Sequence, residues 1–162
     1  MEKVSVTIIT RNEEKNILAC LESVQWADEI IISDSGSTDS TATIAAKYTN
    51  KVHHDPWYGF GKQKNLCADR ASYQWILNVD ADERVSSDLR RDIVNILEKP
   101  DSLDGYYMPR KNYFCGQWIK RGGWYPDYNL RLYRKDFGRF SEREFHEAVV
   151  LKGKAGYLRG NL

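Results

Sequence analysis

Short β-branched runs alternate with segments of helical periodicity over the first hundred residues. Val4–Thr10 is almost entirely apolar or β-branched, which is typical of a buried strand. Glu14–Val24 instead repeats its apolar residues at the spacing of one helical face. The same reasoning predicts strands at Glu29–Ser33, Val52–His53 and Trp75–Val79, and helices from Ser37 or Thr38 to about Tyr48, at Lys62–Arg70 and at Asp88–Leu97, the last capped by Ser86 or Ser87.

Strands that alternate with helices predict an α/β sandwich with a mostly parallel central sheet. After Gly105 the pattern changes, because strand-like segments follow one another without clear helices between them. These segments are Gly105–Arg110, Asn129–Arg134 and Ala148–Lys152, with a loop or hairpin over Tyr113–Tyr128. We therefore expect one domain over residues 1–162, with a regular half at 1–105 and a less regular half at 106–162. We also expect this domain to be truncated at its C-terminus, soon after a strand-like segment.

The net charge of +1 conceals a difference between the two halves. Residues 1–105 carry 12 Lys and Arg against 18 Asp and Glu, whereas residues 106–162 carry 12 against 5. The second half also holds 13 of the 20 aromatic residues. Either this half has a solvated basic surface over an aromatic core, or it binds an anionic partner such as a phosphorylated sugar, a lipid headgroup or a nucleic acid.

Composition argues against several classes of protein. No apolar run approaches the ~20 residues of a membrane span, and no signal peptide precedes the first strand, so we expect a cytoplasmic protein. Cys20, Cys67 and Cys115 are far apart, which favours buried thiols over a disulfide framework or a zinc site. The glycine motifs of dinucleotide-binding folds and P-loop NTPases are absent.

Three of the predicted strands end in polar residues, at the edge where parallel α/β sheets bind ligands. Asp80 and Asp82, near a rigid strand tip, suit Mg²⁺ or Mn²⁺ bound together with substrate phosphates. An acidic turn that caps the next segment explains the pair equally well. Asp34 can likewise serve its own turn alone, or also accept hydrogen bonds from a ribose or a base edge. The three tips are Thr10-Arg11-Asn12-Glu13, Asp34-Ser35-Gly36-Ser37-Thr38-Asp39 and Asp80-Ala81-Asp82-Glu83.

Two further segments carry candidate chemistry. A helix opened by two glycines has lysines in its first turn, where they oppose the helix dipole. We expect Lys62 in solvent and Lys64 either in solvent or facing an anion such as a diphosphate. His146-Glu147 is not a His-Glu-x-x-His zinc motif, because residue 150 is valine. An isolated His-Glu dipeptide is commonly structural, but Glu147 could also act as a general base.

Taken in order, these motifs resemble family 2 glycosyltransferases. The resemblance spans about residues 4–98 and rests on the three strand tips and on Gly61…Lys64-Asn65. A later stretch is similar to bacterial enzymes that glucosylate the lipopolysaccharide inner core: Tyr125-Pro126-Asp127, Arg131-Leu132-Tyr133-Arg134 and His146-Glu147. The resemblance implies a GT-A fold, the Rossmann-like fold of nucleotide-diphospho-sugar transferases. It also implies a UDP-sugar donor, UDP-glucose foremost, inversion at the anomeric carbon, and Mg²⁺ or Mn²⁺ as cofactor.

Roles for individual residues follow from the same resemblance. Asp82 is expected to bind the metal, and Asp80 to lie near the ribose and the metal. Glu147 best matches the position of the catalytic base, ahead of Glu144, although His146-Glu147 replaces the family's usual Glu-Asp pair. The residues expected at the donor are Thr10, Asn12, Glu13, Asp34, Gly36, Lys64, Asp80 and Ala81.

The basic, aromatic second half suits a phosphorylated saccharide or lipid-linked acceptor at the inner face of the cytoplasmic membrane, with no nucleic acid involved. Phosphate contacts are expected from Lys120, Arg121, Arg131 and Arg134, and sugar stacking from Trp118, Trp124 and Tyr125. Two alternatives remain. A metal-dependent nucleotidyltransferase typically needs a glycine-rich basic loop after the first strand. A non-enzymatic nucleotide-binding module leaves the strand-tip carboxylates unexplained.

Overall fold

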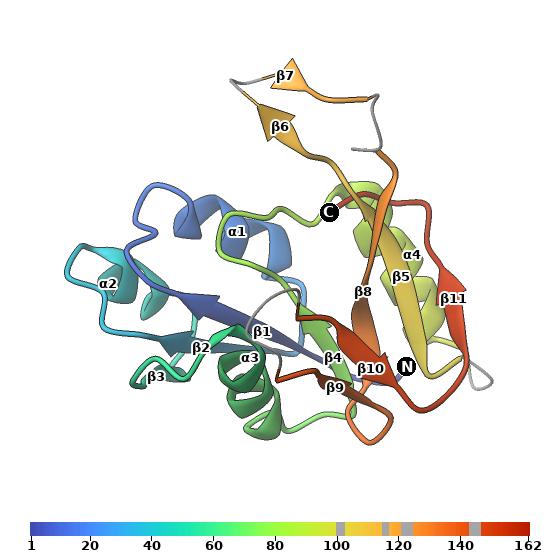
Figure 1. The fold of residues 1–162 in the computed structure, drawn as a ribbon, viewed down its shortest axis with the longest axis horizontal. Helices are drawn as coiled ribbons and strands as arrows, with labels where there is room; N and C mark the ends of the chain where they lie inside the picture. The colour runs from blue at the N-terminus through green and yellow to red at the C-terminus, as the bar shows by residue number, and fades with distance from the viewer. Residues whose placement is uncertain (100–102, 115–116, 121–124, 143–146) are drawn as a thin grey trace.

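A seven-stranded sheet forms the centre of the computed structural model, which describes residues 1–99, 103–114, 117–120, 125–142 and 147–162 (Figure 1). The strand order is β11-β5-β8-β4-β1-β2-β3. Only β8 runs antiparallel to its neighbours within this sheet, which confirms the predicted, mostly parallel arrangement. The strands are β1 (Val4–Thr10), β2 (Glu29–Asp34), β3 (Val52–His54), β4 (Trp75–Asn78), β5 (Gly105–Arg110), β8 (Asp127–Arg134) and β11 (Ala155–Tyr157).

Helices cover both faces of the sheet, as the predicted sandwich requires (Figure 1). Alternate residues of β1 point into two separate cores. Val6 packs in the core that contains α1, α2 and α4, whereas Ile9 packs with Cys67 of α3. The helices are α1 (Ile17–Val24), α2 (Thr41–Ala45), α3 (Phe60–Asp69) and α4 (Ser87–Leu97).

Capping bonds decide where two of the helices begin. Ser86 caps α4 as predicted, because its hydroxyl accepts a hydrogen bond from the Leu89 N–H. The second helix is shorter than the predicted span from residue 37 or 38 to Tyr48. The residues of the first expected helical turn make other hydrogen bonds, since the Thr38 N–H donates to the Asn12 side chain at 2.8 Å. The local hydrogen bonds of the turn therefore prevail over the helical pattern there.

Short strands complete the second half of the chain. β6 (Tyr113–Phe114) and β7 (Gln117–Trp118) form a hairpin that projects from the body, within the span predicted as loop or hairpin (Figure 1). β10 (Val149–Leu151) pairs with β9 (Gly138–Phe140). Neither β9 nor β11 was expected, because three residues with little apolar alternation give no strand signal.

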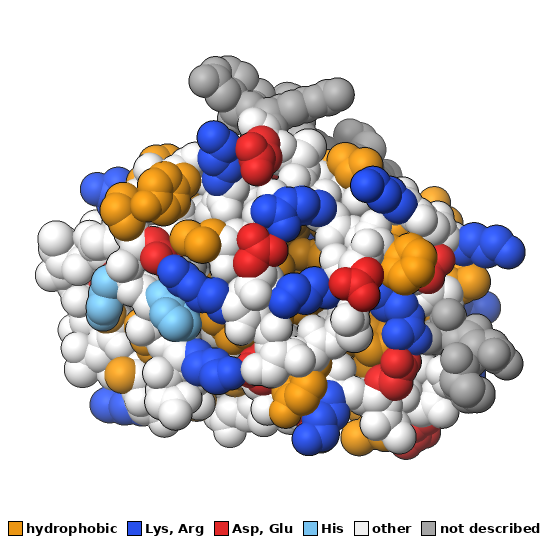
Figure 2. Space-filling model, turned by 90° about the horizontal axis from the view of Figure 1, so that it is seen from below, with side chains coloured by type: hydrophobic (Ala, Val, Ile, Leu, Met, Phe, Trp, Pro, Cys, Tyr) orange, Lys and Arg blue, Asp and Glu red, His pale blue; other side chains and the backbone are white. Residues whose placement is uncertain are grey.

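The surface and the cysteines bear on the sequence predictions. Figure 2 shows acidic and basic side chains interspersed over the face that carries α3, so this face is not of one charge. Among the described residues, no helix is long and apolar enough to span a bilayer. Cys20 and Cys67 are buried free thiols, as predicted, and burial raises the pKa of each to about 12. Cys115 lies outside the described residues.

A buried carboxylate begins β2, at the end of the sheet away from the polar strand tips. Glu29 accepts hydrogen bonds from the Ser72 N–H at 2.9 Å and hydroxyl at 2.7 Å, and from Lys51 and Ser5. Burial raises the pKa of Glu29, but these hydrogen bonds outweigh it and lower the pKa to about 2. The folded state therefore stabilises the ionised carboxylate fully above pH 4.5 and loses this contribution as the pH falls toward 2.

We expect Glu29→Gln to lower the free energy of unfolding at pH 7 by about 3 kcal/mol, because a shift of one pKa unit corresponds to about 1.4 kcal/mol. The difference from the wild type should shrink as the pH falls below 4.5. Urea unfolding at pH 7 and at pH 3 measures both effects, with the exposed Glu98→Gln as control. An equal loss at the two pH values would show that the carboxylate is not held in its ionised form.

Candidate functional site

A cavity of about 390 Å³ opens at the carboxyl ends of β1 and β4. The parallel register aligns the strand tips, because Thr10 pairs with Asp34, Asp34 with His54, and Thr7 with Asn78. The predicted meeting of the polar tips at one edge of the sheet is thus confirmed. The cavity is lined by Ile9, Thr10, Arg11, Glu13, Trp57, Phe60, Lys64, Asp80, Ala81, Asp82 and Glu147.

Lys64 of α3 is the buried cation of this cavity. Only 2% of the residue is exposed, and its Nζ lies 3.0 Å from Asp80 Oδ1 and 3.1 Å from Glu147 Oε1. The helix is fixed in place because the Asn65 side chain donates to and accepts from the Phe140 backbone, at 3.0 Å and 2.9 Å. Lys64 therefore faces carboxylates rather than solvent, whereas Lys62 is exposed as predicted.

Asp80 is held by two cations from different parts of the chain. Its second oxygen, Oδ2, accepts from Arg131 at 2.9 Å, and Arg131 also donates to Asn78 at 2.8 Å and to Glu83 at 3.0 Å. Burial raises the pKa of Asp80, but Arg131 and Lys64 outweigh it and hold that pKa well below its usual range. Burial raises the pKa of Glu83. The turn after β4 is therefore anchored by an internal ion network.

Two sequence predictions for the acceptor side need correction. The predicted contact of Arg131 with acceptor phosphates is wrong, because the residue is 5% exposed and its guanidinium serves Asn78, Asp80 and Glu83. Arg134 does not reach the cavity either. It pairs with Glu2 at 2.8 Å, at the far end of β8. The sequence of a strand thus does not indicate which carboxylate a basic residue in it will pair with.

The two aspartates of the acidic turn differ in their fit to a divalent ion. Both oxygens of Asp80 are engaged by cations, whereas Asp82 is exposed and has no ion-pair partner among the described residues. The described part of the chain contains no group of three His, Cys, Asp or Glu side chains arranged for a metal. Magnesium sites commonly use one or two carboxylates and complete their shell with water and substrate phosphates. Asp82 fits such a site, and Asp80 would join only by giving up a cation.

The second strand tip forms a closed hydrogen-bonded turn. Asp34 is 1% exposed and accepts from the Ser37 N–H at 3.1 Å and from the Ser37 hydroxyl. Asn12 adopts a left-handed conformation, with φ of 54°, and accepts from the Thr38 N–H. Gly36 supplies the positive φ of 79° that the turn requires. These three residues do not line the cavity, and their contact with a donor stays a prediction.

Other predicted donor residues do reach the cavity. The Thr10 side chain is buried, and its hydroxyl oxygen has no hydrogen-bond partner among the described residues. An unpartnered buried hydroxyl is uncommon in folded proteins and indicates a missing partner. Glu13 also lines the cavity, with its carboxylate accepting from Asn16 at 2.8 Å.

Two aromatic side chains at the cavity were missed by the sequence reasoning. Trp57 and Phe60 pack edge to face, with ring centroids 4.8 Å apart, and both are about half exposed. The sequence feature that could have identified these two aromatic residues is their position beside the two glycines at the start of α3. Gly61 is required there, because a Cβ would lie 2.1 Å from the Ser141 carbonyl oxygen. This close approach places Ser141 against α3.

Several predicted residues lie outside the described ranges or on the projecting hairpin. On the hairpin side, Trp118 packs edge to face against Tyr125 with centroids 5.1 Å apart, and the Lys120 Nζ lies 4.4 Å from the centre of the Trp118 ring. The residues outside the described ranges are Arg121, Trp124, Glu144 and His146.

Comparisons with known proteins identify relatives of this chain. LpsC of Rhizobium meliloti, a lipopolysaccharide core biosynthesis glycosyltransferase, is 34% identical over 96% of this chain and 60% of its own length. The chain thus spans little more than half the length of the curated relatives it matches.

Two solved structures share the fold. The Staphylococcus aureus TarS 1–349 complex with UDP has a TM-score of 0.64 at 22% identity, over 86% of this chain and 50% of its own. The Mycobacterium tuberculosis glucosyl-3-phosphoglycerate synthase complex with Mn²⁺, UDP and glucosyl-3-phosphoglycerate has a TM-score of 0.58 at 22% identity, over 68% of this chain and 45% of its own. These likenesses confirm the predicted GT-A fold. The model of glycosyl transferase family 2 matches residues 5–158, and the chain belongs to that family.

Proposed function

We propose that this chain forms the donor-binding and catalytic part of an inverting hexosyltransferase. It would move a hexose, glucose foremost, from a UDP-sugar to a saccharide acceptor. One observation carries the proposal: Glu147, Lys64 and Asp82 line a single cavity at the strand tips. The likeness to LpsC supports a role in lipopolysaccharide core or other cell-envelope glycan synthesis.

Charge explains how the cavity would bind the donor. A diphosphate leaving group gains negative charge as the glycosidic bond breaks, so positive charge nearby lowers the barrier. Mg²⁺ or Mn²⁺ at Asp82, with Asp80 beside it, would supply that charge when bound. Lys64 offers one ammonium to two carboxylates, so a diphosphate would compete with Glu147 for it. The unpartnered Thr10 hydroxyl is available to the nucleoside.

Glu147 is the proposed general base. It is partly exposed and carries a carboxylate that can take the proton from the acceptor hydroxyl. The hydroxyl oxygen then bonds to the anomeric carbon while the bond from that carbon to the diphosphate oxygen breaks. Attack on the face opposite the leaving group inverts the configuration. Lys64 positions Glu147 before the donor arrives, because the two groups are 3.1 Å apart.

The structure favours neither the nucleotidyltransferase nor the non-enzymatic nucleotide-binding module, for different reasons. A nucleotidyltransferase would use the same acidic turn, but the first strand ends at Thr10-Arg11-Asn12-Glu13 without a glycine-rich phosphate loop. A non-enzymatic nucleotide-binding module would have no use for Glu147 beside Lys64 at the strand tips. Both alternatives predict binding of a nucleotide without a preference for its sugar, which an experiment can separate.

In a thermal shift assay of the full-length protein, we expect UDP-glucose with Mn²⁺ to raise the melting temperature by roughly 5–11 °C. A ligand at 100 times its Kd contributes about 2.7 kcal/mol, and 1 kcal/mol corresponds to about 2–4 °C for a protein of 150–250 residues. Asp82→Asn should remove the part of this shift that depends on Mn²⁺. The exposed Asp88→Asn, which removes a carboxylate outside the cavity, is the control.

Other outcomes of the same assay would decide against the proposal. Stabilisation by a nucleoside triphosphate but not by UDP-sugars would favour the nucleotidyltransferase. No response to either ligand would contradict both enzymatic readings. An equal Mn²⁺-dependent shift in Asp82→Asn and in the wild type would remove Asp82 as the metal ligand.

We place the acceptor beside the projecting hairpin. The hairpin carries Trp118 between basic side chains, which suits a phosphorylated saccharide or a lipid-linked acceptor. Contact with a membrane surface, a cytoplasmic location and the absence of nucleic-acid binding stay predictions from the sequence, as does the single domain over residues 1–162.

A further inference from the structure

A second cavity, of about 650 Å³, lies on the other side of the acidic turn. Asp80 and Asp82 line both cavities, so the two spaces meet at this turn. The second cavity is enclosed by the segment between β4 and α4, by the end of β5, and by residues 161–162. A molecule in the second cavity would therefore lie next to the donor cavity, on the other side of the acidic turn.

Three cations line this second cavity, and they differ in their partners. Arg110 is already paired, because its Nη2 lies 2.8 Å and its Nε 3.1 Å from Asp127 Oδ2. Arg84 donates to the Glu83 carbonyl at 2.8 Å, and Lys111 lies 4.6 Å from the centre of the Trp118 ring. Neither Arg84 nor Lys111 has a carboxylate within 4.0 Å in the part of the chain that the structure describes.

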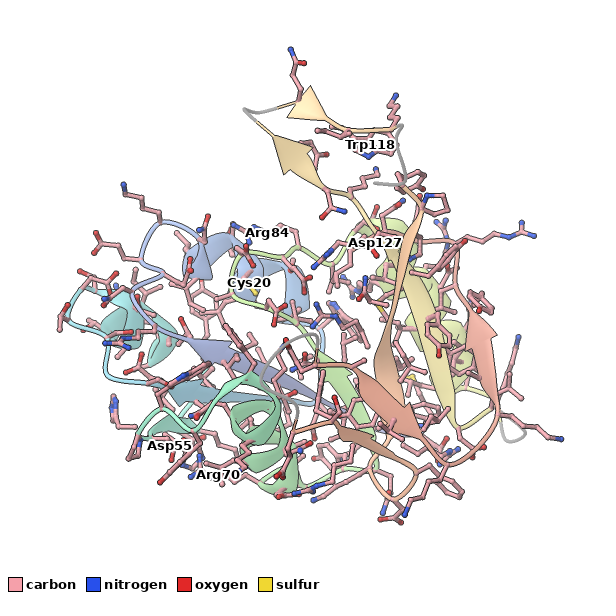
Figure 3. All side chains as sticks on the ribbon, viewed as in Figure 1. Cys20, Asp55, Arg70, Arg84, Trp118 and Asp127 are labelled. Atoms are coloured by element: carbon pink, nitrogen blue, oxygen red, sulfur yellow. The ribbon has the colours of Figure 1, made fainter. Side chains whose placement is uncertain are left out.

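Both unpaired cations are only partly exposed, which makes their lack of a counter-ion informative. A half-buried charge loses part of its hydration, and an opposite charge restores the lost stabilisation. Three carboxylates lie on the same wall, and none of them pairs with Arg84 or Lys111 in the part of the chain that the structure describes. Asp80 and Glu83 are bound by Arg131, and Asp82 lies more than 4.0 Å from both cations. Figure 3 shows Arg84 on the segment that follows β4 and Trp118 on the hairpin beyond it.

We infer that the second cavity is an acceptor subsite in which Arg84 and Lys111 bind an anionic group, a phosphate or a carboxylate, of the acceptor. Guanidinium and ammonium groups are the usual partners of such anions. Tyr113 adds an aromatic ring that is 63% exposed and lines the same cavity, which suits the face of a sugar. This inference rests on the proposed function, since it assigns the cavity to the second substrate of that reaction.

The test titrates inorganic phosphate and glucose 6-phosphate into the full-length protein saturated with UDP and Mn²⁺, followed by calorimetry. UDP would occupy the nucleotide part of the donor cavity, so R84Q/K111Q decides whether an anion bound in its presence lies in the second cavity. The double variant R84Q/K111Q should weaken binding of both probes by about tenfold or more, because each lost group removes a charge-assisted hydrogen bond. The charge-preserving R84K/K111R should retain most of it.

A matched control removes two positive charges away from the cavity. Arg91 and Lys99 are exposed at α4 and just after it, so R91Q/K99Q changes the net charge equally and should bind the probes like the wild type. Equal weakening in this control would reduce the effect to overall charge and overturn the inference. Probe binding that is absent from the UDP-loaded wild type, or unchanged in R84Q/K111Q, would overturn it as well. Failure of UDP itself to bind would instead contradict the proposed function.

A further arm separates the two sources of the anion. Sedimentation with phosphatidylglycerol vesicles, compared with phosphatidylcholine vesicles, reports binding to a lipid headgroup. A loss of vesicle binding in R84Q/K111Q but not in R91Q/K99Q would support the subsite and assign it to a lipid-borne phosphate. Binding of glucose 6-phosphate without vesicle binding would support the subsite and assign it to a phosphate on the saccharide.

Discussion

Replacing Glu147 by glutamine should reduce transfer by at least about 100-fold while donor binding changes little. Glutamine keeps the size of the side chain and an oxygen for Lys64 but cannot accept the proton of the acceptor hydroxyl. A positioned general base contributes about 10²- to 10⁴-fold to a rate. Release of UDP from UDP-glucose in the presence of acceptor measures the transfer, and titration with UDP measures the binding.

The control for this variant is Glu142→Gln. Glu142 is exposed, and its carboxylate lies 4.0 Å from Lys62. The substitution Glu142→Gln therefore removes a nearby negative charge that does not line the cavity. Because Glu147→Gln also weakens a buried ion pair with Lys64, its melting temperature must be compared with that of the wild type. Full transfer by Glu147→Gln would remove Glu147 as the base. A loss of UDP binding equal to the loss of transfer would make it a donor-site residue instead.

The regular half of the fold could be predicted because its signals are local. β1 and β2 are runs of buried residues, and the capping serine of α4 stands next to its helix. The polar strand tips were then placed together by one rule, the common direction of parallel strands. Prediction weakened where a local hydrogen bond competed with periodicity, as in the turn that shortens α2. It also weakened where strands have only three residues, as in β9.

The charge partners in the site could not be predicted in the same way. Lys64 and Glu147 are 83 residues apart in the chain, and Arg131 and Asp80 are 51 apart. A periodic pattern states which face of an element is buried but not which ion an opposing element presents. α3 makes the limit plain, since it buries Gln63, Lys64 and Asn65 against the sheet and β9. Only the folded arrangement shows that these polar residues are satisfied.

The ion network also connects the two cavities. Glu147, Lys64, Asp80, Arg131 and Glu83 alternate in sign and contact one another in that order. A donor phosphate that drew Lys64 toward itself would weaken one end of this series and leave Arg131 to hold Asp80. Arg131 contacts both Asp80 and Glu83 and therefore holds the acidic turn at two points.

Arg131→Met should lower the free energy of unfolding by about 3–5 kcal/mol, the cost of removing one partner from a buried ion pair. Methionine fills a similar volume but leaves Asp80 short of one cation and Glu83 without its hydrogen bond at 3.0 Å. The melting temperature should fall by roughly 6–20 °C at about 2–4 °C per kcal/mol. Urea unfolding and a thermal melt at pH 7 give the two measurements.

The same substitution three residues later provides the control. Arg134→Met removes a guanidinium from the same strand, but Arg134 pairs with the partly exposed Glu2, so we expect a loss of about 1 kcal/mol or less from that pair. The pH dependence gives a second check. Without Arg131, Asp80 and Glu83 can relieve their repulsion by taking up protons, so the gap between Arg131→Met and the wild type should narrow as the pH falls from 7 toward 4.5. Equal losses in the two variants, or a gap that does not change with pH, would mean that Arg131 acts through packing and not by holding the acidic turn.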